Sequence, residues 1–205
     1  MPLHHPNGIR QFSLVAYNPN KHHRRSLRLP GYNYTQPGAY YITICTYQRQ
    51  GWFGDVVDGE MGCNRLGDIV YTFWQGLPHR FPHIKLDAFV VMPNHLHGIL
   101  MITEQGRKSI QFDTPVESFG KPVPGSIPTV VRSFKSAVTT RINLMRPASS
   151  TPVWQRNYHE SIIRIESGLH RVRQYIINNP CQWASDAENP RYNSDDRTWD
   201  LDLYF

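Results

Sequence analysis

The chain has 205 residues, which suits a single domain and is enough to bury a sizeable core. Its 22 basic and 16 acidic residues give a net charge of +6, which favours an anionic partner such as nucleic acid. Three scattered cysteines without a C-x-x-C pair argue against a disulfide framework or zinc cluster. No membrane-length apolar run or signal-peptide core is present, so we expect a cytoplasmic protein that does not bind membranes.

Residues 1–38 are polar and interrupted by prolines, and they carry a basic cluster with Arg24, Arg25 and Arg28. We interpret them as an extended basic arm whose arginines contact DNA phosphates, although a solvated tail fits as well. A domain at 39–183 and a C-terminal tail at 184–205 are predicted to follow.

The first predicted element of the domain is a strand over 39–47, dense in β-branched and aromatic residues. Asp58-Gly59 then predicts a hairpin turn. Residues 65–77 have an apolar stripe at helical spacing that ends before Pro78, which predicts a helix.

The stretch FVVMPNHLHGILMI, residues 89–102, predicts two short buried strands around a turn at Pro93-Asn94. Side chains alternate across a strand, so His95 and His97 share one face while Leu96 points into the core. Two imidazoles on one rigid face can bind one metal ion. A lone His-x-His is weak evidence, however, and a hydrogen-bonded histidine pair is the alternative.

A Gly- and Pro-rich loop is predicted over 103–125, and then a helix over 126–146 with Ser126 as its N-cap. Three basic residues of this helix lie outside its apolar stripe and are candidates for DNA contact: Arg132, Lys135 and Arg141. A strand over 153–165 and a helix over 167–179, closed by Pro180, complete the pattern. Few strands without strict alternation of helix and strand predict an α+β domain, with an antiparallel sheet covered by helices mainly on one face.

The last predicted helix supplies possible partners for the histidines. Tyr175 and Asn179 are four residues apart, so they project from one helical face. If this face packs beside the histidines, Asn179 completes a three-ligand metal site and Tyr175 lies one turn away. A core tyrosine and a capping asparagine are the alternative.

Three segments, VVMPNHLHGILMI, VWQRNYHESIIRI and RVRQYIINNPCQW, occur in this order along the chain. Together they resemble the single-tyrosine HUH transposases, and within these the REP-associated tyrosine transposases, over about residues 29–183. The resemblance implies an RRM/ferredoxin-like fold, with His95, His97 and Asn179 as metal ligands and Tyr175 as the nucleophile. Ser161 departs from the family pattern, which often has histidine there.

The resemblance also implies a reaction. A divalent ion, Mg²⁺ or Mn²⁺, would stabilise charge on the scissile phosphate of single-stranded DNA while Tyr175 forms a 5′-phosphotyrosine. Hairpin-flanked DNA is the implied substrate, and either a monomer or a homodimer is compatible with the sequence.

Three other classes compete with this interpretation. A histidine-triad hydrolase would need a histidine at Ile99. A metal-dependent phosphodiesterase that activates water would use the same ligands without Tyr175. A noncatalytic RRM-type binder would need exposed strand aromatics, for which Tyr40, Tyr41 and Tyr47 are candidates.

Overall fold

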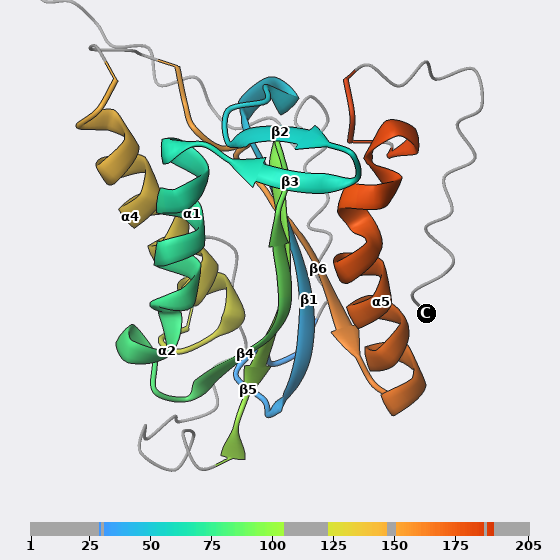
Figure 1. Cartoon of the computed structure of the whole chain (residues 1–205). Coiled ribbons are helices and arrows are strands. Elements are labelled where there is room, and N and C mark those ends of the chain that lie inside the picture. Colours follow the sequence, from blue (N-terminus) through green and yellow to red (C-terminus); the bar gives the residue numbers. More distant parts are fainter. Residues whose placement is uncertain (1–28, 30, 105–122, 147–150, 187, 191–205) are drawn as a thin grey trace, which may run out of the picture.

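In a computed structural model of the chain, we describe Leu29 and residues 31–104, 123–146, 151–186 and 188–190. A four-stranded antiparallel sheet has the order β4-β5-β1-β6 and forms the centre of the fold (Figure 1). Its strands are β1 (Gly38–Cys45), β4 (Ile84–Val91), β5 (His95–Ile102) and β6 (His159–Ile163). The predicted α+β class with an antiparallel sheet is confirmed.

Helices cover both faces of the sheet, with more of them on one side. On one face lie α1 (Arg65–Gln75), α2 (Leu77–Arg80) and α4 (Ile127–Asn143), and on the other lies α5 (Glu166–Gln182) (Figure 1). Without α5, β2 and β3, the order of β1, α1, β4, β5, α4 and β6 is the ferredoxin-like βαββαβ arrangement. The helix that carries Tyr175 and Asn179 is therefore the one on the less covered face.

Alternation along β5 separates the core from the candidate site. Leu96 and Leu100 are fully buried in the larger hydrophobic core, together with residues of α1 and α4. Ile99 belongs instead to a smaller core with Leu169, Val172 and Ile176 of α5. His95 and His97 are on the same face as Ile99, because successive strand residues point in opposite directions.

The strand predicted over 153–165 is shorter in the structure. Trp154 forms an isolated bridge with Thr46, and regular pairing with β1 begins only at His159. Between them the chain leaves the sheet, where the Lys135 ammonium group donates to the carbonyls of residues 155, 156 and 157 at 2.7, 3.1 and 3.2 Å. These carbonyls are thus satisfied by a side chain rather than by a strand partner.

The last helix also differs from its prediction. The sequence predicts that Pro180 closes it, but α5 runs on to Gln182 with Pro180 inside its last turn. Proline removes one helical hydrogen bond. The buried side chains of Ile176 and Asn179, and a hydrogen bond from Asn179 to Asp186, hold the helix across this position.

Smaller elements surround this framework. Two 3₁₀ turns, η1 (Tyr47–Arg49) and η2 (Trp183–Ser185), follow β1 and α5. Strands β2 (Gly54–Val57) and β3 (Glu60–Cys63) form the predicted hairpin, with Asp58 and Gly59 both at positive φ as a two-residue turn requires. Tyr34, which the sequence places in the arm, is buried against Tyr40.

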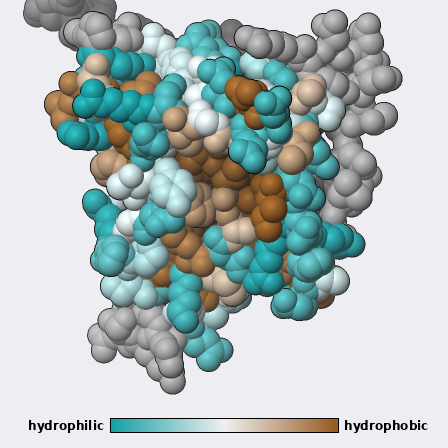
Figure 2. Space-filling view, viewed as in Figure 1, coloured by the Kyte–Doolittle hydropathy of each residue, from teal (hydrophilic) through white to brown (hydrophobic). Residues whose placement is uncertain are grey.

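The surface between α1 and α5 is partly apolar. Figure 2 shows hydrophobic residues gathered in the middle of this view, where β4 forms one edge of the sheet and Leu86, Ala88 and Phe89 are half-buried. Among the described helices, none combines the length and the hydrophobicity that crossing a membrane requires.

Gly98 is required by the packing of α1 on the sheet. A Cβ there would lie 2.5 Å from Cζ2 of Trp74 and 3.1 Å from Cβ of Phe89. We therefore expect Gly98→Ala to destabilise the fold by about 1–3 kcal/mol, measured by urea unfolding. Gly51→Ala is the matched control, because its Cβ would meet Pro93 at an ordinary 3.8 Å. Equal stabilities of the two variants would contradict this account of the packing of α1.

Candidate metal and tyrosine site

His95 begins β5 and is completely buried. Its Nδ1 lies 2.8 Å from Oδ1 of Asn94. The orientation of the Asn94 amide follows from its other hydrogen bonds, since Nδ2 faces the carbonyls of Arg49 at 3.0 Å and Glu188 at 2.6 Å. Because Oδ1 can only accept, Nδ1 of His95 must donate, and in the neutral ring Nε2 then carries a lone pair.

His97 lies two residues further along the same face, with its ring centroid 4.4 Å from that of His95. Its Nδ1 contacts two hydroxyl groups, Tyr41 at 2.7 Å and Thr43 at 2.9 Å. Both hydroxyls can accept a hydrogen bond, so they are compatible with a proton on Nδ1 and a lone pair on Nε2. Such outer contacts orient metal-binding histidines in general.

Helix α5 brings Tyr175 and Asn179 to the histidines. The Tyr175 hydroxyl lies 3.4 Å from Nε2 of His97, and the two ring centroids are 5.2 Å apart. Arg173 fixes the register of the helix on β4 through two hydrogen bonds, of 2.8 and 2.7 Å, to the Asp87 carboxylate. This interaction holds the pKa of Asp87 below its usual value. Asp87 lies where the register between β4 and β5 shifts. This irregularity of the strand orients the Asp87 side chain toward α5.

Two polar atoms of this cluster are buried without a hydrogen-bond partner of acceptable geometry among the described residues: His95 Nε2 and Asn179 Oδ1. Both residues are at most 1% exposed. The Asn179 side chain lies beside His95 and raises the pKa of that ring, against the larger effect of burial. An unpaired buried lone pair is costly. A divalent ion would satisfy both atoms at once, so these residues fit a metal site.

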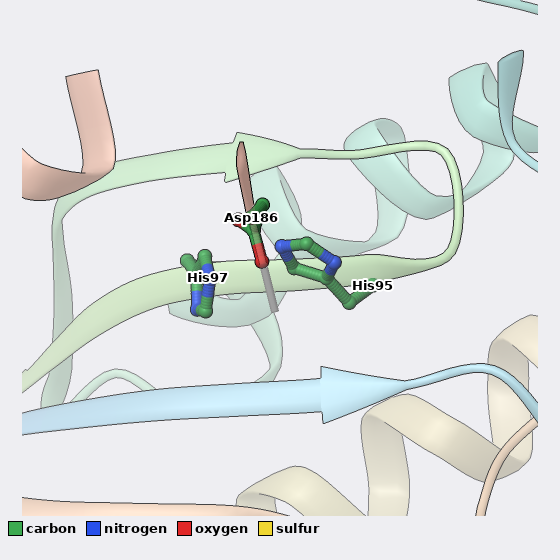
Figure 3. A group of neighbouring side chains, drawn as sticks. All are labelled: His95, His97 and Asp186. Carbon is green, nitrogen blue, oxygen red and sulfur yellow. The ribbon is translucent and has the colours of Figure 1, made fainter. Parts of the chain in front are cut away.

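Asp186 also lies at this cluster, and sequence reasoning missed it. Its carboxylate points toward the space between the two imidazole rings (Figure 3), and one ligand atom from each of His95, His97 and Asp186 lies within 4.8 Å of the others. The residue follows η2, inside the segment that the sequence predicts to be a tail. No periodic pattern predicts this position, because a 3₁₀ turn and a proline-containing helix end separate it from Asn179.

Burial controls the charge of the two histidines. It lowers the pKa of His95 to about 4, an effect that Asp186 and Asn179 only partly oppose. Burial also holds the pKa of His97 well below its ordinary value, and the neighbouring His95 adds to this. Both rings are therefore neutral at pH 7, the form that binds metal ions.

The predicted DNA-contacting residues are not part of this cluster. Arg24, Arg25 and Arg28 lie outside the described residues. Arg132 and Arg141 are exposed on α4, across the sheet from α5. Lys135 uses its three ammonium hydrogens on backbone carbonyls, and burial lowers its pKa to about 8.

The low pKa of His95 predicts how stability depends on pH. An unfolded histidine titrates near 6.5, so between about pH 6.5 and 4 the unfolded chain binds more protons than the folded one. Without metal, the protein should lose on the order of 3 kcal/mol through His95 alone as the pH falls through this window.

Urea unfolding in EDTA at pH 7, 6, 5 and 4 measures this loss. His95→Gln should flatten the pH dependence, whereas His79→Gln, at an exposed position, should leave it unchanged. A His95→Gln protein with the parental pH dependence would refute the assignment.

Comparison with known proteins finds a relative by sequence and similar folds among solved structures. No established family profile matches the chain. Among solved structures, a REP-associated tyrosine transposase bound to a REP hairpin is 18% identical, with a TM-score of 0.48 over 90% of this chain and 88% of that one. A candidate transposase of Deinococcus radiodurans is 20% identical, with a TM-score of 0.43 over 74% of this chain and 97% of that one. TM-scores this low add no argument for function.

An uncharacterized protein of Haemophilus influenzae is 40% identical to this chain over 175 residues. The match covers 84% of this chain and 96% of that protein, so the similarity extends over nearly the whole relative. The chain therefore belongs to the same protein family as this Haemophilus influenzae protein.

Proposed function

We propose that this protein is a metal-dependent, single-tyrosine transposase of the HUH type that cuts and rejoins single-stranded DNA. This proposal is based on side chains of β5 and α5 that meet at one place. Two buried neutral imidazoles on β5 lie beside the Asn179 amide on α5, and His95 Nε2 and Asn179 Oδ1 have no partner of acceptable geometry within the described part of the chain. A tyrosine hydroxyl lies 3.4 Å from Nε2 of His97. The motifs that resemble the REP-associated enzymes contain these same four residues.

His95, His97 and Asn179 would hold the ion through Nε2, Nε2 and Oδ1. Mn²⁺ and Mg²⁺ are the expected ions for a mixed set of imidazole nitrogen and oxygen ligands that must leave positions for phosphate and water. When bound, the ion supplies Lewis-acid stabilisation of the charge that develops on the scissile phosphate.

Tyr175 would act as the nucleophile. Its Oη forms a bond to phosphorus while the bond from phosphorus to the 3′-oxygen breaks, which leaves a 5′-phosphotyrosine and a free 3′-hydroxyl. The phenolic proton leaves to water, and the departing 3′-oxygen takes one up. Attack by the 3′-hydroxyl of another strand reverses the step, so strands are rejoined without an external energy source.

The DNA is expected to be single-stranded and hairpin-flanked, because the motifs resemble those of the REP-associated branch. The basic excess of the chain agrees with such a partner. An enzyme of this kind would act in the cytoplasm, where bacterial DNA lies.

The rival classes are less well supported. An RRM-type binder needs exposed aromatic rings on its strands, but Tyr40 and Tyr41 are at most 4% exposed. A water-activating phosphodiesterase could use the same ligands, but it gives no role to the tyrosine hydroxyl beside His97.

Two tyrosine variants separate these functions. Tyr175→Phe removes one oxygen and keeps the ring, so it should abolish both cleavage and the covalent adduct while Mn²⁺ binding persists. Tyr158→Phe is the matched control, because its hydroxyl donates to Glu160 and its ring packs on the larger core, away from the histidines. It should lose a hydrogen bond to a buried carboxylate, worth about 1.5–3 kcal/mol of stability, and still cut DNA.

The assay uses a pool of single-stranded hairpin oligonucleotides with Mn²⁺, and denaturing gels report the protein–DNA adduct. If Tyr175→Phe cuts DNA without an adduct, the phosphodiesterase is the correct class. If the adduct moves to Tyr158, the assignment of the nucleophile is wrong.

The basic arm is expected to increase the affinity for DNA without contributing to sequence specificity. Replacing Arg24, Arg25 and Arg28 by alanine should weaken binding to all sequences alike. It should also flatten the slope of log K against log salt by roughly one unit for each phosphate that the variant no longer neutralises. The comparison variant replaces Arg132 and Arg141, which lie across the sheet from the histidines. If only this second variant changes the salt slope, DNA binds along α4 and not along the arm.

A further inference from the structure

The segment after α5 is attached to the site by several interactions that the proposed reaction does not use. The carbonyl of Glu188 accepts from Asn94, the residue that orients His95. The Glu188 carboxylate pairs with Arg49 at 2.5 Å and accepts from the Cys45 thiol at 3.4 Å. The Trp183 ring lies 5.9 Å from the His95 ring. These interactions hold Asp186, which lies between Trp183 and Glu188, over the histidines.

The segment after α5 is bound by a turn, η1, whose backbone is strained. Gln48 and Arg49 both have positive φ, at 52° and 54°, although neither is glycine. Such backbone is unfavourable for residues other than glycine and persists only where the surrounding structure holds it. The Arg49 carbonyl accepts from Asn94, and its guanidinium pairs with Glu188. The turn thus positions Arg49 for its ion pair with Glu188.

Asp186 already has one hydrogen bond on each carboxylate oxygen. Oδ1 accepts from the backbone N–H of Glu188 at 2.7 Å, and Oδ2 accepts from Nδ2 of Asn179 at 3.0 Å. The second bond orients the Asn179 amide, and its Oδ1 is the atom left without a partner of acceptable geometry among the residues that the structure describes. Each carboxylate oxygen has further lone pairs, so Asp186 can both orient Asn179 and bind an ion directly.

We propose that Asp186 is a fourth, anionic ligand of the divalent ion, and that the Arg49–Glu188 ion pair, with Asn94, positions it. This inference rests on the proposed metal site. Two imidazoles and an amide carry no charge, so the Asp186 carboxylate supplies the one negative charge of the set. Ligand charge is a main determinant of divalent-ion affinity. Arg49 and Glu188 are positioning residues that raise this affinity without touching the ion.

Mn²⁺ titration calorimetry on the full chain, without DNA, tests the proposal. Asp186→Asn keeps the size and one acceptor oxygen for Asn179 but removes the charge, so Mn²⁺ binding should weaken roughly tenfold or more. The double variant, with Asp186→Asn added to Asn179→Ala, should bind Mn²⁺ more weakly than Asn179→Ala alone. If Asp186 acts only by orienting Asn179, adding Asp186→Asn to Asn179→Ala has no effect on Mn²⁺ affinity. That result would refute the role of Asp186 as a ligand.

The positioning pair is tested by charge exchange. Arg49→Glu and Glu188→Arg should each weaken Mn²⁺ binding, and the double variant should recover most of the affinity. Arg80→Gln is the control, because this exposed arginine ends α2, on the face of the sheet opposite α5. Single variants with parental Mn²⁺ affinity, or a double variant without recovery, would refute the positioning role.

His95→Ala distinguishes a failure of this inference from a failure of the metal site itself. If His95→Ala abolishes Mn²⁺ binding while Asp186→Asn does not change it, the site stands and only the fourth ligand is wrong. If His95→Ala binds Mn²⁺ normally, both proposals fail. Unfolding in EDTA checks that each variant is folded.

Discussion

The hydrogen bond from Nδ1 of His95 to Asn94 is the interaction on which the rest of the site depends. It sets the tautomer of a completely buried imidazole, and it leaves Nε2 as a lone pair without a protein partner of acceptable geometry among the described residues. A buried lone pair of this kind lowers the stability of the metal-free protein. Burial keeps both rings neutral, which favours metal binding over protonation. The same asparagine joins the turn at Arg49 to the segment that carries Asp186.

Strand β5 contributes to the hydrophobic core with one face and to the candidate site with the other. Leu96 and Leu100 stabilise the fold against α1 and α4, and the alternate residues of the same strand face α5. Close packing between Trp74 and Gly98 keeps β5 rigid under the site. The Arg173–Asp87 pair is half-buried, so its contribution to stability is small, but its two hydrogen bonds set the register of α5 two residues before Tyr175. Rigid placement of this kind matters for a nucleophile that must attack in line.

The parts of this arrangement that follow from local periodicity could be predicted from the sequence. Alternation along 95–102 gives the shared face of the histidines, and the four-residue spacing gives the shared face of Tyr175 and Asn179. The contributions of Asp186 and Lys135 could not be predicted. Asp186 reaches the site through an irregular segment held by long-range interactions. Lys135 binds carbonyls 20 to 22 residues away, and the last strand begins only after them. Pro180 misled the prediction of the helix end, because tertiary packing outweighs the one missing helical bond there.

The central claim is that the imidazole pair on β5 and the amide on α5 bind one divalent ion beside Tyr175. Anomalous diffraction from crystals grown with Mn²⁺ tests it most directly, because the signal locates the ion independently of any activity. One strong peak is expected within bonding distance of Nε2 of His95, Nε2 of His97 and Oδ1 of Asn179. A protein saturated with Mn²⁺ whose anomalous peak lies away from both imidazoles would contradict it.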